Sequence, residues 1–373
     1  MKIVYIVAKE MPFGGGIESY TEEVGSRLVK YGHDVTVYTL KGDELPGRTY
    51  LGMRIKGTPC IRTKVFEKIT GTIMATLLQC KDENVDIVHF HGFGSIILAF
   101  IMRLKHRRIF LQGHGIEWKR SRWNCVIKFF LKLIEVESVR FADRVIVVSK
   151  LLKSYLWEKY HRESAYIPNG VNPPKLRKPS LINKLGLNGN DYIFFAARLV
   201  REKGAHYLIE AYKRLNTNLK LVIAGDAKYE GKYKEELQNL SSDNPNIIFT
   251  GFIKGEILEE LFSNCFIFVL PSEIEGLSIA LLEAMSYGNC CLVSDIPENL
   301  EAINNFGFSF RSKDSIDLTE KLKYLIDHQD EVDSVRKASA EYVLNNYSWD
   351  KVAQQVEKLY KQSLNKKINQ NAG

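Results

Sequence analysis

Apolar residues recur along this chain in short, β-branched runs that alternate with longer segments of helical spacing. The runs KIVYIVA, DVTVYTL, VDIVHFH, RIFLQGH, RVIVVS and SAYIPNG in the first half each predict a buried strand. A second series follows: YIFFAARL, LKLVIAGD, NIIFTGF, FIFVLPS and NCCLVSD. The amphipathic segments between the runs predict helices at residues 17–31, 75–81, 205–215, 232–240, 257–265 and 278–287. This alternation is typical of parallel sheets covered by helices, so we expect an α/β fold.

The length of the chain and one interruption of the pattern predict two domains. A chain of 373 residues exceeds what one hydrophobic core usually organises. The stretch NGVNPPKLRKPSLINKLGLNGND breaks the periodicity and predicts the linker. We therefore expect one domain over residues 1–172, a second over residues 173–345, and a helix and tail over residues 346–373. Doubly wound sheets bind ligands at the carboxyl ends of their strands, which predicts a ligand site in a cleft between the domains.

Composition excludes several classes of protein. Hydrophobic residues at 45% and charged residues at 26% do not fit a disordered or fibrous chain, and no apolar run reaches the roughly 20 residues of a membrane helix. The opening MKIVYIVAKE lacks a signal-peptide cleavage site, so we expect a cytoplasmic protein. The six cysteines show neither CxxC pairing nor zinc spacing with histidine, which favours free thiols.

The positive charge is concentrated in the first half. Residues 1–172 hold 27 Lys and Arg against 17 Asp and Glu, whereas residues 173–373 hold 25 against 27. The segment WKRSRWNCVIKFFLKLIEVESVRF mixes basic with aromatic and apolar residues, and MRLKHRRIF adds a second cationic cluster. A basic amphipathic helix of this kind either lies on an anionic membrane leaflet or packs on its own sheet with solvated lysines. Nucleic-acid binding is disfavoured, because no helix-turn-helix, RNA-binding or zinc-finger signature is present.

The segment LPSEIEGLSIALLEAMSYG carries the clearest candidate binding site. An apolar strand ends at Pro271, and after a short loop a helix opens near Ser278. Backbone amides of residues 276–279 at the helix start can donate hydrogen bonds to a phosphate. Glu275 and Glu283 can each accept two hydroxyl hydrogen bonds in one plane, which matches the vicinal diols of a ribose or hexose.

A pair of cations precedes this segment in the stretch FFAARLVREKGAHYLIEAY. Arg198 follows an apolar strand directly, and Lys203 stands with Gly204 just before a helix. Two fixed cations at a strand end suit a diphosphate leaving group, because negative charge grows on its bridging oxygen as the glycosidic carbon departs.

Taken in order, these and other motifs resemble glycosyltransferase family 4, the retaining nucleotide-sugar enzymes of GT-B fold. The resemblance covers nearly the whole chain and is most specific between residues 198 and 295. It implies two Rossmann-like domains that face each other across a cleft, the first binding the acceptor and the second the nucleotide sugar, with the C-terminal helix returning to the first domain. The matching motifs are GGGIESY, HGIE, ADRVIVVSK, IPNGVN, ARLVREKGAHYLIEAY, LVIAGD, IFTGFI, PSEIEGLSIALLEAMSYG and YSWDKVAQQVEKLY.

The resemblance assigns roles to the residues that match the family's motifs. Glu275 would meet hydroxyls of the donor sugar and Glu283 the ribose, while Arg198 and Lys203 would grip the diphosphate. Glu275, Arg198 and Lys203 are expected to be catalytic, together with His114 near the reacting sugar. Further donor contacts are expected at Gly15, Gly16, Gly251, Phe252, Ile253, Gly276, Leu277, Ser278 and Ile279.

Leu277 and Ser278 stand where many members carry Phe and Gly, a change that leaves the backbone amides in place. His91 is expected on the acceptor side. The opening glycines lack the order G-x-G-x-x-G, and no acidic residue ends the second strand, which disfavours a dinucleotide oxidoreductase. With the nucleotide in the second domain, these glycines would face its phosphates across the cleft.

The expected activity is a retaining hexosyltransferase that moves a sugar from a nucleoside-diphosphate sugar, with UDP favoured, to a hydroxyl of a lipid-linked glycan or lipid. The product would belong to bacterial-type surface polysaccharide or lipopolysaccharide, and the enzyme would sit peripherally on the inner face of the membrane. The absence of any Asp-x-Asp argues against a divalent metal, so no cofactor is expected. A nucleotide-sugar epimerase and a GDP-mannose-dependent mannosyltransferase stay open as alternatives, and a two-carboxylate glycosidase is disfavoured by the nucleotide-site motifs.

Overall fold

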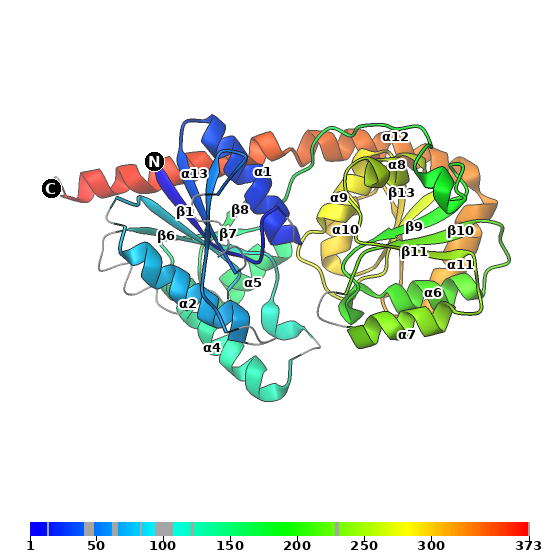
Figure 1. Cartoon of the computed structure of the whole chain (residues 1–373), viewed down its shortest axis with the longest axis horizontal. Helices are drawn as coiled ribbons and strands as arrows, with labels where there is room; N and C mark the ends of the chain where they lie inside the picture. Colours follow the sequence, from blue (N-terminus) through cyan, green and yellow to red (C-terminus); the bar gives the residue numbers. More distant parts are fainter. Residues whose placement is uncertain are drawn as a thin grey trace. The chain divides into compact units, whose positions relative to one another are not determined.

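The computed structural model of this chain describes residues 1–12, 15–40, 48–61, 66–82, 84–93, 107–120, 123–227 and 231–371. It divides into two compact units (Figure 1). The first domain comprises Met1–Asn169 and Trp349–Gly373, and the second domain is Gly170–Ser348. The boundaries expected from the sequence, after residues 172 and 345, each lie three residues away from these.

The first domain is built on a largely parallel sheet with helices on both faces (Figure 1). Among the described residues the sheet has eight strands in the order β3-β4-β2-β1-β5-β6-β7-β8, and the β3–β4 pair alone is antiparallel. The strands are β1 Lys2–Ala8, β2 Asp34–Thr39, β3 Thr49–Tyr50, β4 Met53–Gly57, β5 Ile87–His91, β6 Arg108–Gly113, β7 Arg144–Val147 and β8 Ala165–Tyr166. The helices are α1 Gly16–Lys30, α2 Phe66–Cys80, η1 Glu117–Lys119, α4 Cys125–Phe141, α5 Lys150–Tyr160 and α13 Trp349–Asn371.

The central strands of this sheet are buried on both faces. All five residues of β5 are buried, including His89 and His91, and so are Ile3 to Ile6 of the adjacent β1. A parallel sheet covered on both sides has no solvent face, so its strands are apolar runs and do not alternate with polar residues. The two histidines of β5 are therefore core residues of this domain.

The C-terminal helix α13 belongs to the first domain, as the GT-B resemblance implies. It packs beside α1, where Asp350 accepts a hydrogen bond from Arg27 Nε at 2.6 Å. Further along the helix, Glu357 lies 2.7 Å from Nε2 of His33. The buried Tyr360 hydroxyl contacts Nδ1 of His89 at 2.5 Å. The last helix thus closes the core of a domain that begins at the other end of the chain.

The second domain holds an all-parallel sheet. Among the residues described, the sheet has six strands in the order β11-β10-β9-β12-β13-β14. The strands are β9 Tyr192–Ala196, β10 Lys220–Ala224, β11 Ile247–Gly251, β12 Ile267–Leu270, β13 Cys290–Ser294 and β14 Phe308–Phe310. The helices are η2 Ile182–Leu185, η3 Arg201–Lys203, α6 Ala205–Lys213, α7 Gly231–Ser241, α8 Glu256–Asn264, α9 Ile279–Ser286, α10 Pro297–Ile303, α11 Ser315–Asp327 and α12 Gln329–Asn346.

The order of these strands reverses between β9 and β12. From β9 the chain adds β10 and β11 on one side, then returns to the other side of β9 and adds β12, β13 and β14. In open sheets of this kind a crevice forms at the carboxyl ends of the two strands where the order reverses. The loops that follow β9 and β12 therefore define the natural ligand position of the second domain.

Two helices of the first domain differ from the sequence prediction. The helix expected at residues 75–81 is the end of α2, which begins at Phe66. Its first half contains Gly71 and two threonines, residues of low helix propensity that hide the helical pattern. Residues 118–141 do not form one helix: η1 ends at Lys119, and α4 begins after Asn124, whose side-chain oxygen caps Ile127 N at 2.9 Å.

Three sequence features lie outside the described residues: Gly14, Arg122, and the part of MRLKHRRIF at residues 102–106. No helix in the described part of the chain has the length and apolarity needed to cross a membrane.

Candidate active site

The loops after β9 and β12 carry an ion pair between two predicted site residues. Lys203 Nζ donates to Oε1 of Glu275, and both side chains are largely buried, at 14% and 7% exposure. The buried Ser272 hydroxyl donates to the same oxygen at 2.7 Å. A charge in such a position is tolerated because it is paired and hydrogen-bonded. The structure thus brings Lys203 and Glu275 together at the strand-order reversal.

A glycine lets these two loops approach each other. Gly204 has φ +72° and ψ +18°, and a Cβ atom on it would lie 2.0 Å from the carbonyl oxygen of Pro271. Only glycine combines the left-handed conformation with so close an approach. The contact fixes the end of η3 against the end of β12, and it thereby places Lys203 beside Glu275.

Arg198 is the second predicted cation, two residues beyond the end of β9. Its side chain is exposed and forms no hydrogen bond or ion pair with the residues that the structure describes. The site therefore holds one cation that is already paired with a carboxylate and one that is available to an anion.

The turn after Glu275 leads into helix α9. Leu277 is buried, and the hydroxyl of Ser278 caps the helix by accepting a hydrogen bond from Leu281 N at 3.4 Å. Gly276 and Ile279 flank these residues, and Glu283 lies in the second turn of α9. The helix follows β12, so its first amides lie at the carboxyl edge of the sheet, the edge at which β9 leads to Arg198 and Lys203.

The turn at the end of β11 is the outermost part of this edge. Gly251 has φ +69°, and its carbonyl accepts a hydrogen bond from Gly225 N at 2.9 Å. The Phe252 ring that follows is 56% exposed, whereas Ile253 is partly buried. An exposed aromatic ring at a strand end offers an apolar face to a flat ligand.

The predicted residues of the first domain differ from expectation in two places. His91 is fully buried and lines no open surface; its Nδ1 lies 3.1 Å from Nε2 of the partly buried His114. Gly15 N already donates to Glu18 at 2.7 Å, so this amide is unavailable to a phosphate while the cap is closed. Gly16 starts α1 beside that carboxylate. The burial of His91 follows from the two-sided cover of β5.

Three residues that contact predicted site residues within their own domains were not found from the sequence: Ser272, Glu18 and Thr21. Glu18 stands three residues after Gly15, which is the spacing of a capping box and gives a signal for its role. Ser272 gives no such signal in the sequence, because its hydroxyl reaches Glu275 only through the folded turn. Thr21 contacts Nε2 of His91 at 3.2 Å, across 70 residues of sequence.

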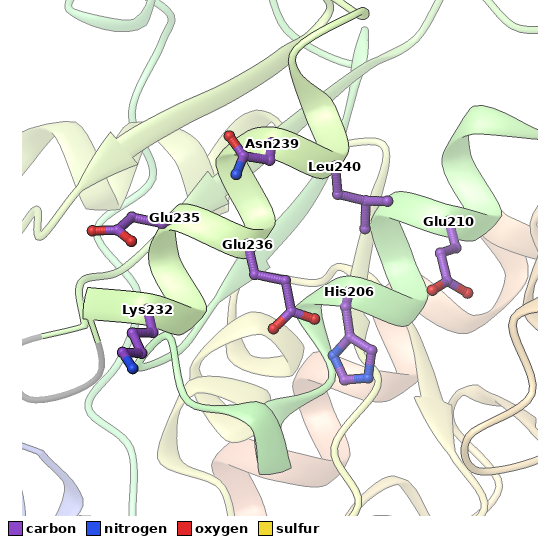
Figure 2. Close-up of a pocket in the computed structure, with 7 residues that line it drawn as sticks. All are labelled: His206, Glu210, Lys232, Glu235, Glu236, Asn239 and Leu240. Carbon is purple, nitrogen blue, oxygen red and sulfur yellow. The ribbon is translucent and has the colours of Figure 1, made fainter.

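A shallow hollow elsewhere on the second domain contains none of the predicted residues. It has a volume of about 570 Å³ and lies over α6 and α7 (Figure 2). Figure 2 shows Glu236 of α7 turned toward His206 of α6, and Arg201 binds the same Glu236 at 2.6 Å. All the residues that line the hollow belong to α6 and α7 and none to the loops after β9 and β12, so the hollow adds nothing to the site at the sheet edge.

Comparison with known proteins defines the class of the chain. A two-domain α/β fold with charged loops at a strand-order reversal is typical of GT-B glycosyltransferases. Residues 14–175 match the family model described as Glycosyltransferase Family 4, and residues 177–342 match that described as Glycosyl transferases group 1. The protein is a glycosyltransferase and belongs to glycosyltransferase family 4.

Individual relatives agree with this class. An uncharacterised glycosyltransferase of Methanocaldococcus jannaschii is 27% identical over 97% of this chain and 98% of its own. The UDP-Gal:alpha-D-GlcNAc-diphosphoundecaprenol alpha-1,3-galactosyltransferase of Escherichia coli is 29% identical over 60% of this chain and 62% of its own.

Solved structures share the fold at lower identity. Sucrose-phosphate synthase of Thermosynechococcus elongatus is 20% identical, with a TM-score of 0.83 over 97% of this chain and 98% of its own. HepE of Anabaena in complex with UDP-glucose is 17% identical, with a TM-score of 0.80 over 97% of this chain and 100% of its own. Two Rossmann-like domains of GT-B type are thereby confirmed.

Proposed function

We propose that this enzyme transfers a hexose from a UDP-sugar to a hydroxyl of a lipid-linked glycan, with retention of the anomeric configuration. The observation that carries the proposal is the buried Lys203–Glu275 ion pair, together with the exposed Arg198, which has no ion-pair partner among the described residues. A UDP donor is supported by the UDP-glucose bound to HepE and by the UDP-Gal named for the E. coli relative. The lipid-linked acceptor is supported by the diphosphoundecaprenol in that relative's name.

In this proposal Arg198 receives the donor diphosphate first. Lys203 then exchanges its carboxylate partner for a phosphate oxygen, and Glu275 is released to accept hydrogen bonds from hydroxyls of the donor sugar. The bond between the anomeric carbon and the phosphate oxygen breaks with both electrons going to the diphosphate, whose growing charge the two cations stabilise. The acceptor oxygen bonds to the anomeric carbon, and its proton leaves to a diphosphate oxygen.

The remaining contacts follow the same assignment. The exposed Phe252 ring and the Gly251 turn would hold the base, and Glu283 the ribose. The amides at the start of α9 would complete the phosphate site. In this proposal no metal takes part, because two cations and a helix N-terminus would neutralise the diphosphate.

Helix α4 supports attachment to a membrane. Its packed side holds Glu135, only 1% exposed, which accepts hydrogen bonds from Tyr155 and Tyr160 at 2.5 Å and from Lys159 at 3.1 Å. Its solvent side holds five apolar residues that are between 41% and 63% exposed: Val126, Phe129, Phe130, Leu133 and Val136. A globular helix normally buries its apolar side and exposes its charges. These exposed apolar side chains, with Lys128 and Lys132 on the same helix, suit insertion into an anionic leaflet, here the inner face of the cell membrane.

A thermal-shift panel tests the donor. The purified chain is melted with UDP, GDP, ADP and their sugars, and UDP compounds are expected to raise the melting temperature most, because ligand binding stabilises by mass action. A larger shift with GDP-mannose would replace the UDP assignment. Analysis of the products then separates transfer, which requires an acceptor, from epimerisation, which consumes donor alone.

A further inference from the structure

A line of hydrogen bonds in the first domain runs from helix α1 to His114. Thr21 Oγ1 donates to the carbonyl oxygen of Ile17 at 2.8 Å, in the first turn of α1. The same oxygen lies 3.2 Å from Nε2 of His91. Nδ1 of His91 lies 3.1 Å from Nε2 of His114. Four residues from α1, β5 and the loop after β6 thus form one continuous line.

Counting protons along the line assigns each ring nitrogen. A threonine hydroxyl has one proton, and Thr21 gives it to Ile17, so Thr21 must accept from N–H at Nε2 of His91. A neutral imidazole carries one N–H, which leaves Nδ1 of His91 as an acceptor. His114 must then donate from Nε2, and its Nδ1 keeps a lone pair that no described residue occupies.

The surroundings keep both rings neutral and in place. Burial lowers the pKa of His91 well below its usual value, and His89, His114 and Lys68 add to the effect. Burial, with Lys68 second, lowers the pKa of His114 to about 3. The Tyr5 ring stacks on His91 with a centroid distance of 5.4 Å, and Tyr20 meets both rings edge-on at 5.6 Å. These contacts oppose the ring flip that would exchange the nitrogens.

We propose that Thr21 and His91 are positioning residues that hold His114 in the tautomer protonated at Nε2. His114 then presents Nδ1 as a hydrogen-bond acceptor, which fits a hydroxyl group of the sugar or acceptor and rejects a phosphate oxygen. The tautomer itself stands on the geometry of the first domain. Its use in transfer rests on the proposed function.

The tautomers can be read directly by nitrogen-15 NMR of the full chain labelled at histidine. Two-bond proton–nitrogen correlations are expected to show His91 and His114 neutral and protonated at Nε2 from pH 6 to pH 8. His114→Asn assigns its signals by their loss. A signal from His114 protonated at Nδ1, or a charged His91 in this range, would overturn the proposal.

Thr21→Val removes the acceptor at the start of the line with little change in shape. In this variant the His114 signals are expected to shift toward the Nδ1-protonated form. Thr21→Ser is expected to keep the wild-type signals, and Thr72→Val is expected to leave them unchanged. Thr72 is a suitable control because it is 1% exposed in the same domain and its hydroxyl has no partner among the described residues. Unaltered His114 signals in a folded Thr21→Val protein would refute the role of Thr21.

Activity gives the second readout. With the nucleotide sugar that the wild type uses, Thr21→Val is expected to lower kcat about tenfold, the value of one ordinary hydrogen bond, with the donor KM nearly unchanged. If Thr21→Val changes the tautomer of His114 but leaves kcat unchanged, the proposal that this tautomer assists transfer would be refuted. A wild type that shows the expected tautomers but transfers no sugar would refute the proposed function and leave the tautomer assignment intact.

Discussion

The two domains present their candidate site residues in opposite ways. The second domain places charges at a sheet edge, where Arg198 is exposed and Lys203 is paired with Glu275. The first domain places three neutral histidines among tyrosines in its core, with one of them, His114, partly exposed. Charged groups suit an anionic diphosphate, whereas a neutral acceptor nitrogen suits a hydroxyl. Under the proposed function, the second domain would bind the charged diphosphate and the first domain a hydroxyl group.

The largest effect should come from breaking the charged pair. Lys203→Ala and Glu275→Ala are each expected to lower the rate of sugar transfer about 1,000-fold, because both groups act on charge and hydroxyls at the reacting centre. The measurement is release of nucleoside diphosphate in the presence of a lipid-linked acceptor. Turnover close to that of the wild type in either variant would contradict the assignment.

Arg198 and Glu235 provide the matched variants for this test. Arg198→Ala should lose transfer to a similar extent but keep the wild-type melting temperature, since the Arg198 side chain has no partner among the described residues. Lys203→Ala leaves Glu275 buried without its cation and should therefore melt at a lower temperature. Glu235→Ala, on the exposed side of α7, should change neither property.

The glycine contact that aligns the charged pair gives the next prediction. Gly204→Ala is expected to lower the free energy of unfolding by about 3 kcal/mol, because the methyl group meets the Pro271 carbonyl and the backbone is left-handed. Gly186→Ala is the control: its φ of +71° is nearly the same, but its Cβ would meet only the end of the Lys220 side chain. A loss of about 1 kcal/mol is expected there. Equal losses in denaturant titrations would rule out a special role for the close approach.

The neutral core of the first domain should be sensitive to acid. The folded-state pKa of His89 is lowered to about 3 by burial and by His114, so unfolding lets the ring take up a proton below about pH 6.5. The neutral His89 ring therefore contributes its full stability above that pH and loses it as the pH falls. At pH 5 the loss in the free energy of unfolding is about 2 kcal/mol. The lowered pKa values of His91 and His114 act in the same direction.

Tryptophan fluorescence can follow this domain selectively, since all four tryptophans lie in it. In urea titrations at pH 5 and pH 7.5, the fluorescence transition should move to lower urea in acid more than the circular-dichroism signal of the whole chain. An equal shift of both signals would remove the contrast between the domains.

Substitutions in helix α4 are expected to change membrane binding and to have the smallest effect on the candidate active site. Phe129→Asp combined with Phe130→Asp should abolish flotation with vesicles of phosphatidylglycerol and phosphatidylcholine but leave nucleotide binding unchanged. Leu176→Asp, at a residue that is 71% exposed in the second domain, is the control and should float like the wild type. Failure of the wild type to float with anionic or neutral vesicles at low salt would refute membrane attachment.

The sequence predicted the second domain more completely than the first. Glu275 and Lys203 could be found because a strand, a turn and a helix start follow one another in a readable order. Ser272 could not, because its hydroxyl reaches Glu275 only through the turn that joins them. His91 was misplaced because a strand buried on both faces shows no alternation, so its pattern cannot tell a core histidine from an exposed one. The exposure of the apolar residues of α4 was also hidden, since the sequence pattern does not say which side of an amphipathic helix faces the sheet.

The return of α13 has a consequence for how this protein can be divided. The first domain needs both ends of the gene, because Tyr360 and Trp349 complete its core beside His89 and Tyr20. The second domain is, in topology, an insertion within the first. A fragment of residues 170–348 keeps an uninterrupted six-stranded sheet and the charged loops, whereas a fragment of residues 1–169 would expose the surface that α13 covers. The second domain can therefore be exchanged between relatives as one continuous segment, whereas the first domain has to be exchanged in two pieces.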